Sequence, residues 1–335
     1  MTRSRLVVLS SFVVAGLGLL VAAGAFFLSP ARAAVGPLPP EALALPGDVK
    51  FVTGLDVKRF VASPFYQKYA KLGMSRPDAF REIEEKTGLD PERDIDQVIV
   101  GGVGRGKDHG VVVVLGRFDR AKLAGLIEKE RQGVTWKRHE GAAIYLFGEQ
   151  GRPGAAGALA FLEDNAMVIG SQAVVEATVT NHIQGGSSLR GNAELMALIA
   201  SVRPGSTFWM VGDQTLLADI PKSIPAPGAG GSSQVSLPGL KALTARGDLD
   251  PVISVEVVGE AADEAAAKNL ADVVRGLVAL ASLQASQKPE LKDLASAVSV
   301  TTDAHQVRVN ARLPYELLDS LTSKARRAPE GVEAK

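Results

Sequence analysis

An uncharged apolar run of 23 residues, Leu6–Leu28, is the feature that most limits how this chain can fold. At ~1.5 Å per residue, a helix of this length reaches roughly 34 Å, enough to cross a hydrocarbon core of ~30 Å. Arg3 and Arg5 precede the run, so the positive-inside rule leaves the N-terminus in the cytoplasm and the rest of the chain outside. Residues 1–34 are therefore expected to be a signal peptide or signal anchor.

Two features of this segment favour opposite fates. A cleavable signal usually has an apolar region of about 7–15 residues, so the length of the run favours a retained anchor. The small-residue pattern Ala31-Arg32-Ala33 instead favours cleavage after Ala33. Retention predicts a bacterial inner-membrane protein, held in the membrane through residues 6–28, with an extracytoplasmic C-terminal domain. Cleavage predicts a periplasmic or secreted protein.

The composition excludes several functional classes. The chain has 37 basic and 37 acidic residues and a net charge of zero, so we expect no nucleic-acid partner. It has no cysteine, which excludes disulfides, a lipid-modified cysteine anchor, cysteine-ligated zinc and thiol nucleophiles. No cofactor or metal is predicted. The hydrophobic fraction of 46% and the charged fraction of 22% are ordinary for a globular protein.

Composition divides the rest of the chain into five segments. They are a Pro/Ala-rich spacer at 35–47, a first half at 48–220, a flexible Pro/Gly/Ser loop at 221–238, a second half at 239–325 and a charged tail at 326–335. Whether the two halves form one domain or two is left open.

Val-rich strands alternate with capped helices in both halves. The predicted strands are Lys50–Leu55, Gln97–Val103, Gly110–Gly116, Val134–His139, Ala143–Phe147, Ala158–Leu162, Ala166–Gly170, Thr207–Val211, Val252–Val258, Ala297–Thr302 and Val307–Ala311. The predicted helices begin at Asp56, Asp119 and Pro314 or span Gln172–His182, Ala193–Ser201 and Ala261–Gln284. We expect an α+β fold with a largely antiparallel sheet and helices on one face. The order strand, helix, hairpin, helix occurs twice, at Lys50–Lys129 and Val252–Lys324, which predicts an internal repeat.

The segment Gly101–Lys107 comes close to a phosphate-binding loop. Asp108 follows where a Ser or Thr would bind magnesium, and the next element, from His109 to Leu115, is predicted to be a strand rather than a helix. We therefore interpret this segment as a Gly-rich hairpin loop.

No catalytic, cofactor or metal residue is assigned from the sequence. Asp56, Asp119 and Asp213 each follow a strand, where they suit helix N-caps or, if they converged, an acid/base cluster. The histidines His109, His139, His182 and His305 lack metal-binding spacing and suit surface or capping positions. Ser171 in Gly170-Ser171-Gln172-Ala173 lacks the second glycine of a nucleophile elbow. The stripe Leu270, Val273, Val274, Leu277 and Leu280 suits either the core or an apolar ligand.

Three motifs carry a resemblance. Phe51–Asp56, Ser63-Pro64-Phe65-Tyr66 and Thr87–Asp96 resemble segments of uncharacterised bacterial exported proteins that have an N-terminal membrane segment and a domain of unknown function. The resemblance covers mainly residues 48–130. It implies export and an envelope location, and it brings no known activity or functional residues.

Three functions remain as hypotheses. The first is a membrane-tethered, non-enzymatic binding or scaffold protein of the cell envelope with a protein partner. The second is a carrier or sensor of an apolar ligand, which requires a dry cavity beside Leu270, Val274 and Leu277. The third is an exported hydrolase, which requires at least two of Asp56, Asp119 and Asp213 to lie close together.

Overall fold

The computed structural model describes most of the chain beyond the apolar segment. The described residues are 38–70, 84–85, 87–102, 110–129, 134–147, 157–217, 223–225, 234–236, 239–284 and 296–319. The expected signal segment at 1–34 and the charged tail at 326–335 lie outside these ranges. Among the described helices, none is both long enough and apolar enough to cross a membrane.

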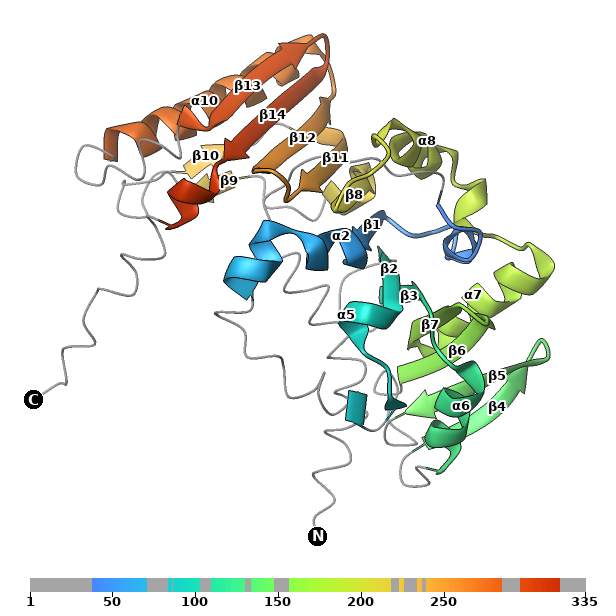
Figure 1. Ribbon diagram of the computed structural model, residues 1–335. Helices are drawn as coiled ribbons and strands as arrows, with labels where there is room; N and C mark the ends of the chain where they lie inside the picture. The colour runs from blue at the N-terminus through green and yellow to red at the C-terminus, as the bar shows by residue number, and fades with distance from the viewer. Residues whose placement is uncertain are drawn as a thin grey trace, which may run out of the picture.

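A twelve-stranded antiparallel sheet organises the described residues (Figure 1). In spatial order its strands are β13 (Val298–Asp303), β14 (Gln306–Leu313), β12 (Ile253–Ala261), β11 (Leu240–Asp248), β8 (Phe208–Asp213), β1 (Phe51–Asp56), β2 (Ile95–Gly102), β3 (Gly110–Gly116), β7 (Ala166–Ser171), β6 (Gly157–Glu163), β5 (Ala142–Phe147) and β4 (Val134–His139). The expected α+β class with a largely antiparallel sheet is confirmed.

Helices cover both faces of the sheet, so the expectation of helices on one face is wrong. On one face, which we call the α7 face, lie α7 (Gln172–Gln184), α8 (Ala193–Ser201) and the 3-10 turns Ala42–Ala44 and Leu189–Gly191. On the other, the α6 face, lie α2 (Val57–Ala62) and α6 (Arg120–Lys129). The physical reason is visible in β3, where Val111 and Val113 enter one core while Val112 and Val114 enter the other. A continuous valine run needs cover on both sides.

The long helix α10 (Glu264–Gln284) also packs on the α6 face, at the far end of the sheet. Residues that lie directly opposite each other on neighbouring strands share one face of the sheet. Successive opposite residues from β14 to β3 therefore all lie on the α6 face: Val309, Val257, Ala245, Met210, Thr53, Val100 and Val112. Leu270 and Ala271 of α10 pack with Val307 there, and Val309 lies against them. The α7 face of β11, β12, β14 and β13 is therefore the side opposite α10, which Figure 1 shows lying along these strands.

The sheet runs without a break through both halves of the chain. β8 of the first half pairs with β11 of the second, from Ala242 opposite Asp213 to Gly247 opposite Phe208. The sequence patterns did not predict β11. Within the expected loop at 221–238, β9 (Ser223–Pro225) and β10 (Gln234–Ser236) pair as a separate two-stranded sheet.

The expected extended spacer belongs in part to the core. Its described residues include the turn Ala42–Ala44, and Leu38, Ala42 and Leu45 are buried among residues of α7 and the sheet. Asn181 of α7 donates a hydrogen bond to the carbonyl of Ala44 at 3.1 Å. Apolar side chains between the prolines fix this segment against the α7 face.

The two segments of the expected repeat differ in how their strands pair. β1 is followed by α2, by a π-helical turn at Tyr66–Ala70, by α5 (Pro91–Asp94) and by the β2–β3 hairpin. β12 is followed by α10 and the β13–β14 hairpin. β1 pairs with β2, the first strand of its hairpin, whereas β12 pairs with β14, the second strand. The two segments therefore occupy different positions in the sheet.

Candidate functional site

Asp56, Asp119 and Asp213 each begin a helix, as the sequence predicts. Asp56 and Asp119 accept hydrogen bonds of 2.9 Å from the backbone N–H three residues ahead, and Asp213 accepts one of 3.2 Å. The last of these opens the short helix α9 (Gln214–Leu217). The bonds satisfy N-terminal amides that have no partner within the helix.

These three carboxylates do not form one cluster. The backbone N–H of Asp213 donates to the carbonyl of Lys50, next to the start of β1, whereas Asp56 ends β1. The six residue-to-residue steps from Lys50 to Asp56 separate the two by ~20 Å of extended strand. Asp119 lies three residues beyond the end of β3, and β2 separates β3 from β1, so the strand of Asp56 and the strand before Asp119 are two strand spacings of ~4.8 Å apart. The arrangement gives the hydrolase hypothesis no carboxylate pair.

The described histidines each contact a polar oxygen. The Nε2–oxygen pairs are His139 with Thr180 at 2.8 Å, His182 with Glu163 at 3.0 Å and His305 with Glu260 at 3.6 Å. His182 lies in the last turn of α7, where the sequence places it. Within the described ranges, no three His, Asp or Glu side chains are grouped so that they could hold a metal ion. His109 lies outside those ranges.

The two motif-like segments have structural explanations. β2 ends at Gly102 and pairs with β3, which begins at Gly110, so the element after the Gly-rich segment is a strand, as predicted. Residues 103–109 lie outside the described ranges. Ser171 ends β7 and occupies the N-cap position of α7.

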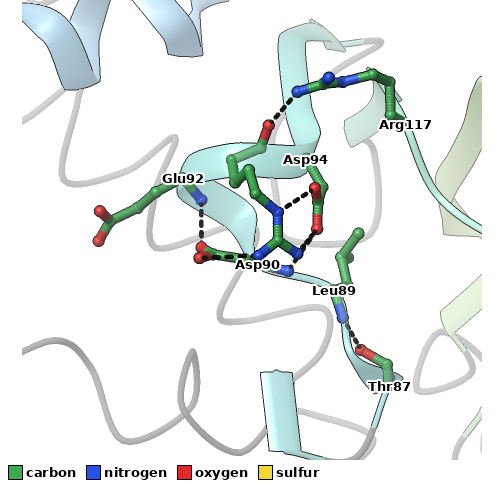
Figure 2. A network of polar contacts seen from close by, with 7 residues as sticks. Thr87, Leu89, Asp90, Glu92, Asp94 and Arg117 are labelled. Atoms are coloured by element: carbon green, nitrogen blue, oxygen red, sulfur yellow. Dashed lines mark hydrogen bonds and ion pairs between the residues drawn. The ribbon is translucent and has the colours of Figure 1, made fainter.

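Figure 2 shows a network of polar contacts around the short helix α5. Asp90 Oδ1 accepts the N–H of Glu92 at 3.0 Å, and Asp94 Oδ2 accepts the N–H of Asp90 at 2.9 Å. The carboxylate of Asp94 also binds the guanidinium of Arg93 through bonds of 2.7 and 2.8 Å. Arg117 then donates to the carbonyl of Arg93 at 2.9 Å. The network caps α5 and ties it to the chain that follows β3, which is a structural role.

Replacing Asp94 by asparagine is expected to lower the free energy of unfolding by about 1–3 kcal/mol at neutral pH, because charge-assisted hydrogen bonds are lost. The hydrogen bond from Arg93 holds the pKa of the Asp94 carboxyl below its ordinary value of 3.8. A carboxyl with a lowered pKa stabilises the folded state above that ordinary value, and the contribution disappears as the pH falls through the folded-state pKa. Urea unfolding of wild type and Asp94→Asn, measured between about pH 7 and about pH 3, should therefore give free energies of unfolding that converge below about pH 4.

The matched control is Asp164→Asn, because the Asp164 side chain is 97% exposed in the β6–β7 turn. If the difference in free energy of unfolding between wild type and Asp94→Asn stayed constant across the acid range, the ionised carboxylate would not be the source of the stabilisation.

Among the described residues, two buried charged side chains that contact each other lie on the α7 face opposite α10. We call this surface of β11, β12, β14 and β13 the open face, since no described helix covers it beyond its border with α8. Its side chains include Thr244, Arg246, Ser254, Glu256, Val258, Glu260, Ser299, Gln306, Arg308, Asn310 and Arg312. A hollow of about 270 Å³ lies where α8 borders it, between Leu198 and Ser201 of the helix and Arg246, Glu256 and Arg308 of the strands.

Three of these residues form what we call the arginine–glutamate cluster. The guanidinium of Arg246 forms an ion pair with Glu256 Oε2, and Arg308 Nη1 lies 2.8 Å from Glu256 Oε1. Arg246 and Glu256 are 8% and 5% exposed, whereas the side chain of Arg308 is 40% exposed. Guanidinium groups stay charged at physiological pH and hold oxyanions in a fixed planar geometry. The cluster thus offers fixed charge and hydrogen-bond donors, which suit recognition better than proton transfer.

Sequence reasoning missed this cluster, although a signal for it exists. In the segment Ile253-Ser254-Val255-Glu256-Val257, and again in Val307-Arg308-Val309-Asn310, polar residues alternate with apolar ones. The alternation places Ser254 and Glu256 on one face of their strand, and Arg308 and Asn310 on one face of theirs. Only the register of β12 with β14 shows that these are the same face of the sheet.

Two residues of the apolar stripe of α10, Leu270 and Val274, pack against the sheet. Leu270 is 9% exposed and packs with Val307, and Val274 lies against the same cluster. Neither residue lines the hollow beside α8. The stripe therefore serves as core at these two positions, and the carrier hypothesis gains no support from them.

Comparisons with known proteins return no relative. No protein-family model matches the chain, and no curated protein and no solved structure matches it significantly.

Proposed function

We propose that this chain is a membrane-tethered extracytoplasmic protein of the cell envelope that binds another protein through its open face. The apolar run Leu6–Leu28 would serve as the anchor and Arg3 and Arg5 as the cytoplasmic flank. The observation that carries the proposal is the arginine–glutamate cluster, which is charged and lies beside a hollow rather than inside a filled core.

The energetics of buried ion pairs support a binding role. A buried ion pair seldom stabilises a fold more than apolar side chains of the same size would, because removing charges from water is costly. Arginine at the centre of an interface is, in contrast, a frequent source of binding energy and specificity. The two other hypotheses, a carrier and a hydrolase, have no comparable group of side chains in the described part of the chain.

The proposal is tested by crosslinking in cells that express the full chain. A photo-crosslinking amino acid at Thr301 or Thr244, on the open face, should give one adduct of the same mass in the membrane fraction. The same group at Asp164, in the remote β6–β7 turn, should not give it. Adding Glu260→Lys, which reverses a half-buried charge beside the α8 hollow, should reduce the adduct at least about fivefold, and Asp164→Lys should leave it unchanged.

Two results would count against this function. One is equal adduct formation at all three positions, which indicates nonspecific contact. The other is a soluble chain whose N-terminus, measured by mass spectrometry, begins after residue 28, since the tether would then be absent.

A further inference from the structure

The open face contains a second hollow, of about 310 Å³, at the edge of the sheet formed by β12, β14 and β13. Its polar lining consists of Ser254, Glu256, Ser299, Arg308, Asn310 and Arg312. The register places Ser254 opposite Arg312 and places both Glu256 and Ser299 opposite Asn310. Residues directly opposite each other share one face of a sheet, so these side chains converge from three strands.

Positive charge dominates this hollow. Arg308 and Arg312 line it, and Glu256 is the one carboxylate in the lining. Arg246 lies opposite Glu256 on β11 and forms an ion pair with it. Both oxygens of Glu256 are already engaged, one by Arg246 and the other by Arg308. Asp248, which pairs with Ser254 in the register, is not part of the lining, and its carboxylate is 3.4 Å from the hydroxyl of Thr207.

The remaining groups are hydrogen-bond donors of the kind that hold an oxyanion. Arginine binds phosphate through paired N–H bonds, and serine hydroxyl and asparagine amide groups donate to single oxygens. Ser254, which is 9% exposed, supplies a buried hydroxyl, while Arg312 is exposed. Donors that approach from three strands suit a tetrahedral anion better than a planar carboxylate.

We propose that this hollow, which we call the edge hollow, binds a phosphate group. The group can belong to a small phosphorylated molecule or to the headgroup of an anionic lipid, because both present the same tetrahedral oxyanion. Binding here does not depend on the proposed protein partner.

The test is titration of the full chain in neutral detergent with inorganic phosphate at constant ionic strength, by calorimetry and by the thermal unfolding temperature. Wild type should bind phosphate saturably and unfold at a higher temperature as phosphate is added. Arg312→Gln should weaken binding about tenfold or more, since a charge-assisted contact is lost. Ser299→Ala should weaken it by about threefold to tenfold through loss of a neutral hydrogen bond.

The matched control is Arg203→Gln, because Arg203 is exposed just after α8 and lies outside the lining. It should bind phosphate as wild type does. Absence of saturable binding in wild type, or equal affinity in wild type and both lining variants, would overturn the proposal. Arg312 and Ser299 are exposed, so their replacements test binding without unfolding the chain.

Moving the full chain into lipid discs distinguishes the two sources of the phosphate group, a lipid headgroup and a small phosphorylated molecule. If the ligand is a lipid, phosphatidylglycerol in the disc should compete with inorganic phosphate and weaken its binding in wild type, relative to discs of phosphatidylcholine alone. If the ligand is a soluble phosphorylated molecule, glycerol phosphate should compete and the disc composition should have no effect. A negative titration would leave the crosslinking test of the protein partner intact, and a negative crosslinking result would leave this titration intact.

Discussion

Replacing Glu256 by glutamine is expected to lower the free energy of unfolding by about 3–5 kcal/mol, because removing one member of a buried ion pair leaves the opposite charge in a low-dielectric site without its carboxylate. Glu256 is 5% exposed and binds the guanidinium groups of both Arg246 and Arg308. Glutamine keeps the shape of the side chain, so the loss reports charge rather than packing. Urea unfolding of wild type and variant in the same detergent measures it.

The chain provides a matched control for this change. Glu260 lies on the same strand and the same face as Glu256, and its side chain is 36% exposed with His305 Nε2 at 3.6 Å. Glu260→Gln should change the free energy of unfolding by no more than about 0.5 kcal/mol, because a carboxylate that stays in contact with water contributes little. Equal losses for the two glutamine variants would show that Glu256 is not held as a buried charge.

A double variant tests whether the charges of Arg246 and Glu256 stabilise each other. In Arg246→Leu/Glu256→Leu the guanidinium of Arg246 is removed together with the carboxylate. The double variant should therefore be less destabilised than the sum of the two single variants, by about 1 kcal/mol or more. Strict additivity would mean that the two side chains do not depend on each other.

Local patterns predicted the parts of the fold whose burial is set by near neighbours. Val134–His139 and Ala193–Ser201 have the bounds that the sequence predicts, since alternation and a capped apolar stripe define β4 and α8 directly. Leu240–Asp248 was missed because Lys241, Arg246 and its small side chains do not resemble a strand. It becomes one because β8 and β12 flank it and bind its backbone on both edges.

The arginine–glutamate cluster could not be predicted from the sequence, because its contacts also depend on which strands are neighbours. The helix caps Asp56, Asp119 and Asp213 were predictable, because a cap depends only on the residues that follow it. Glu256 and Arg308 lie on different strands with α10 between them in the sequence, and their contact depends on the register of β12 with β14. A one-residue shift of that register would place one of them against α10 instead.

Replacing Trp209 by alanine is expected to lower the free energy of unfolding by about 3–5 kcal/mol, the usual range for removing a buried aromatic ring. Trp209 is 1% exposed and lies in β8, the strand that joins the two halves of the sheet. Its ring covers Gly54 of β1, where an added Cβ would lie 2.3 Å from the indole Nε1. Gly54→Ala should therefore also destabilise the fold, by about 1–3 kcal/mol, because the enclosed ring has little room to move.

The chain has two tryptophans, and the other one supplies both the control and the reporter for this prediction. Trp136 is 53% exposed on the edge strand β4, so Trp136→Ala should change the free energy of unfolding by about 1 kcal/mol or less. That variant keeps only the buried Trp209, whose fluorescence should shift to longer wavelength when β8 separates from its neighbours. If Trp136→Ala proved as destabilising as Trp209→Ala, the burial of Trp209 in β8 would not explain the loss of stability.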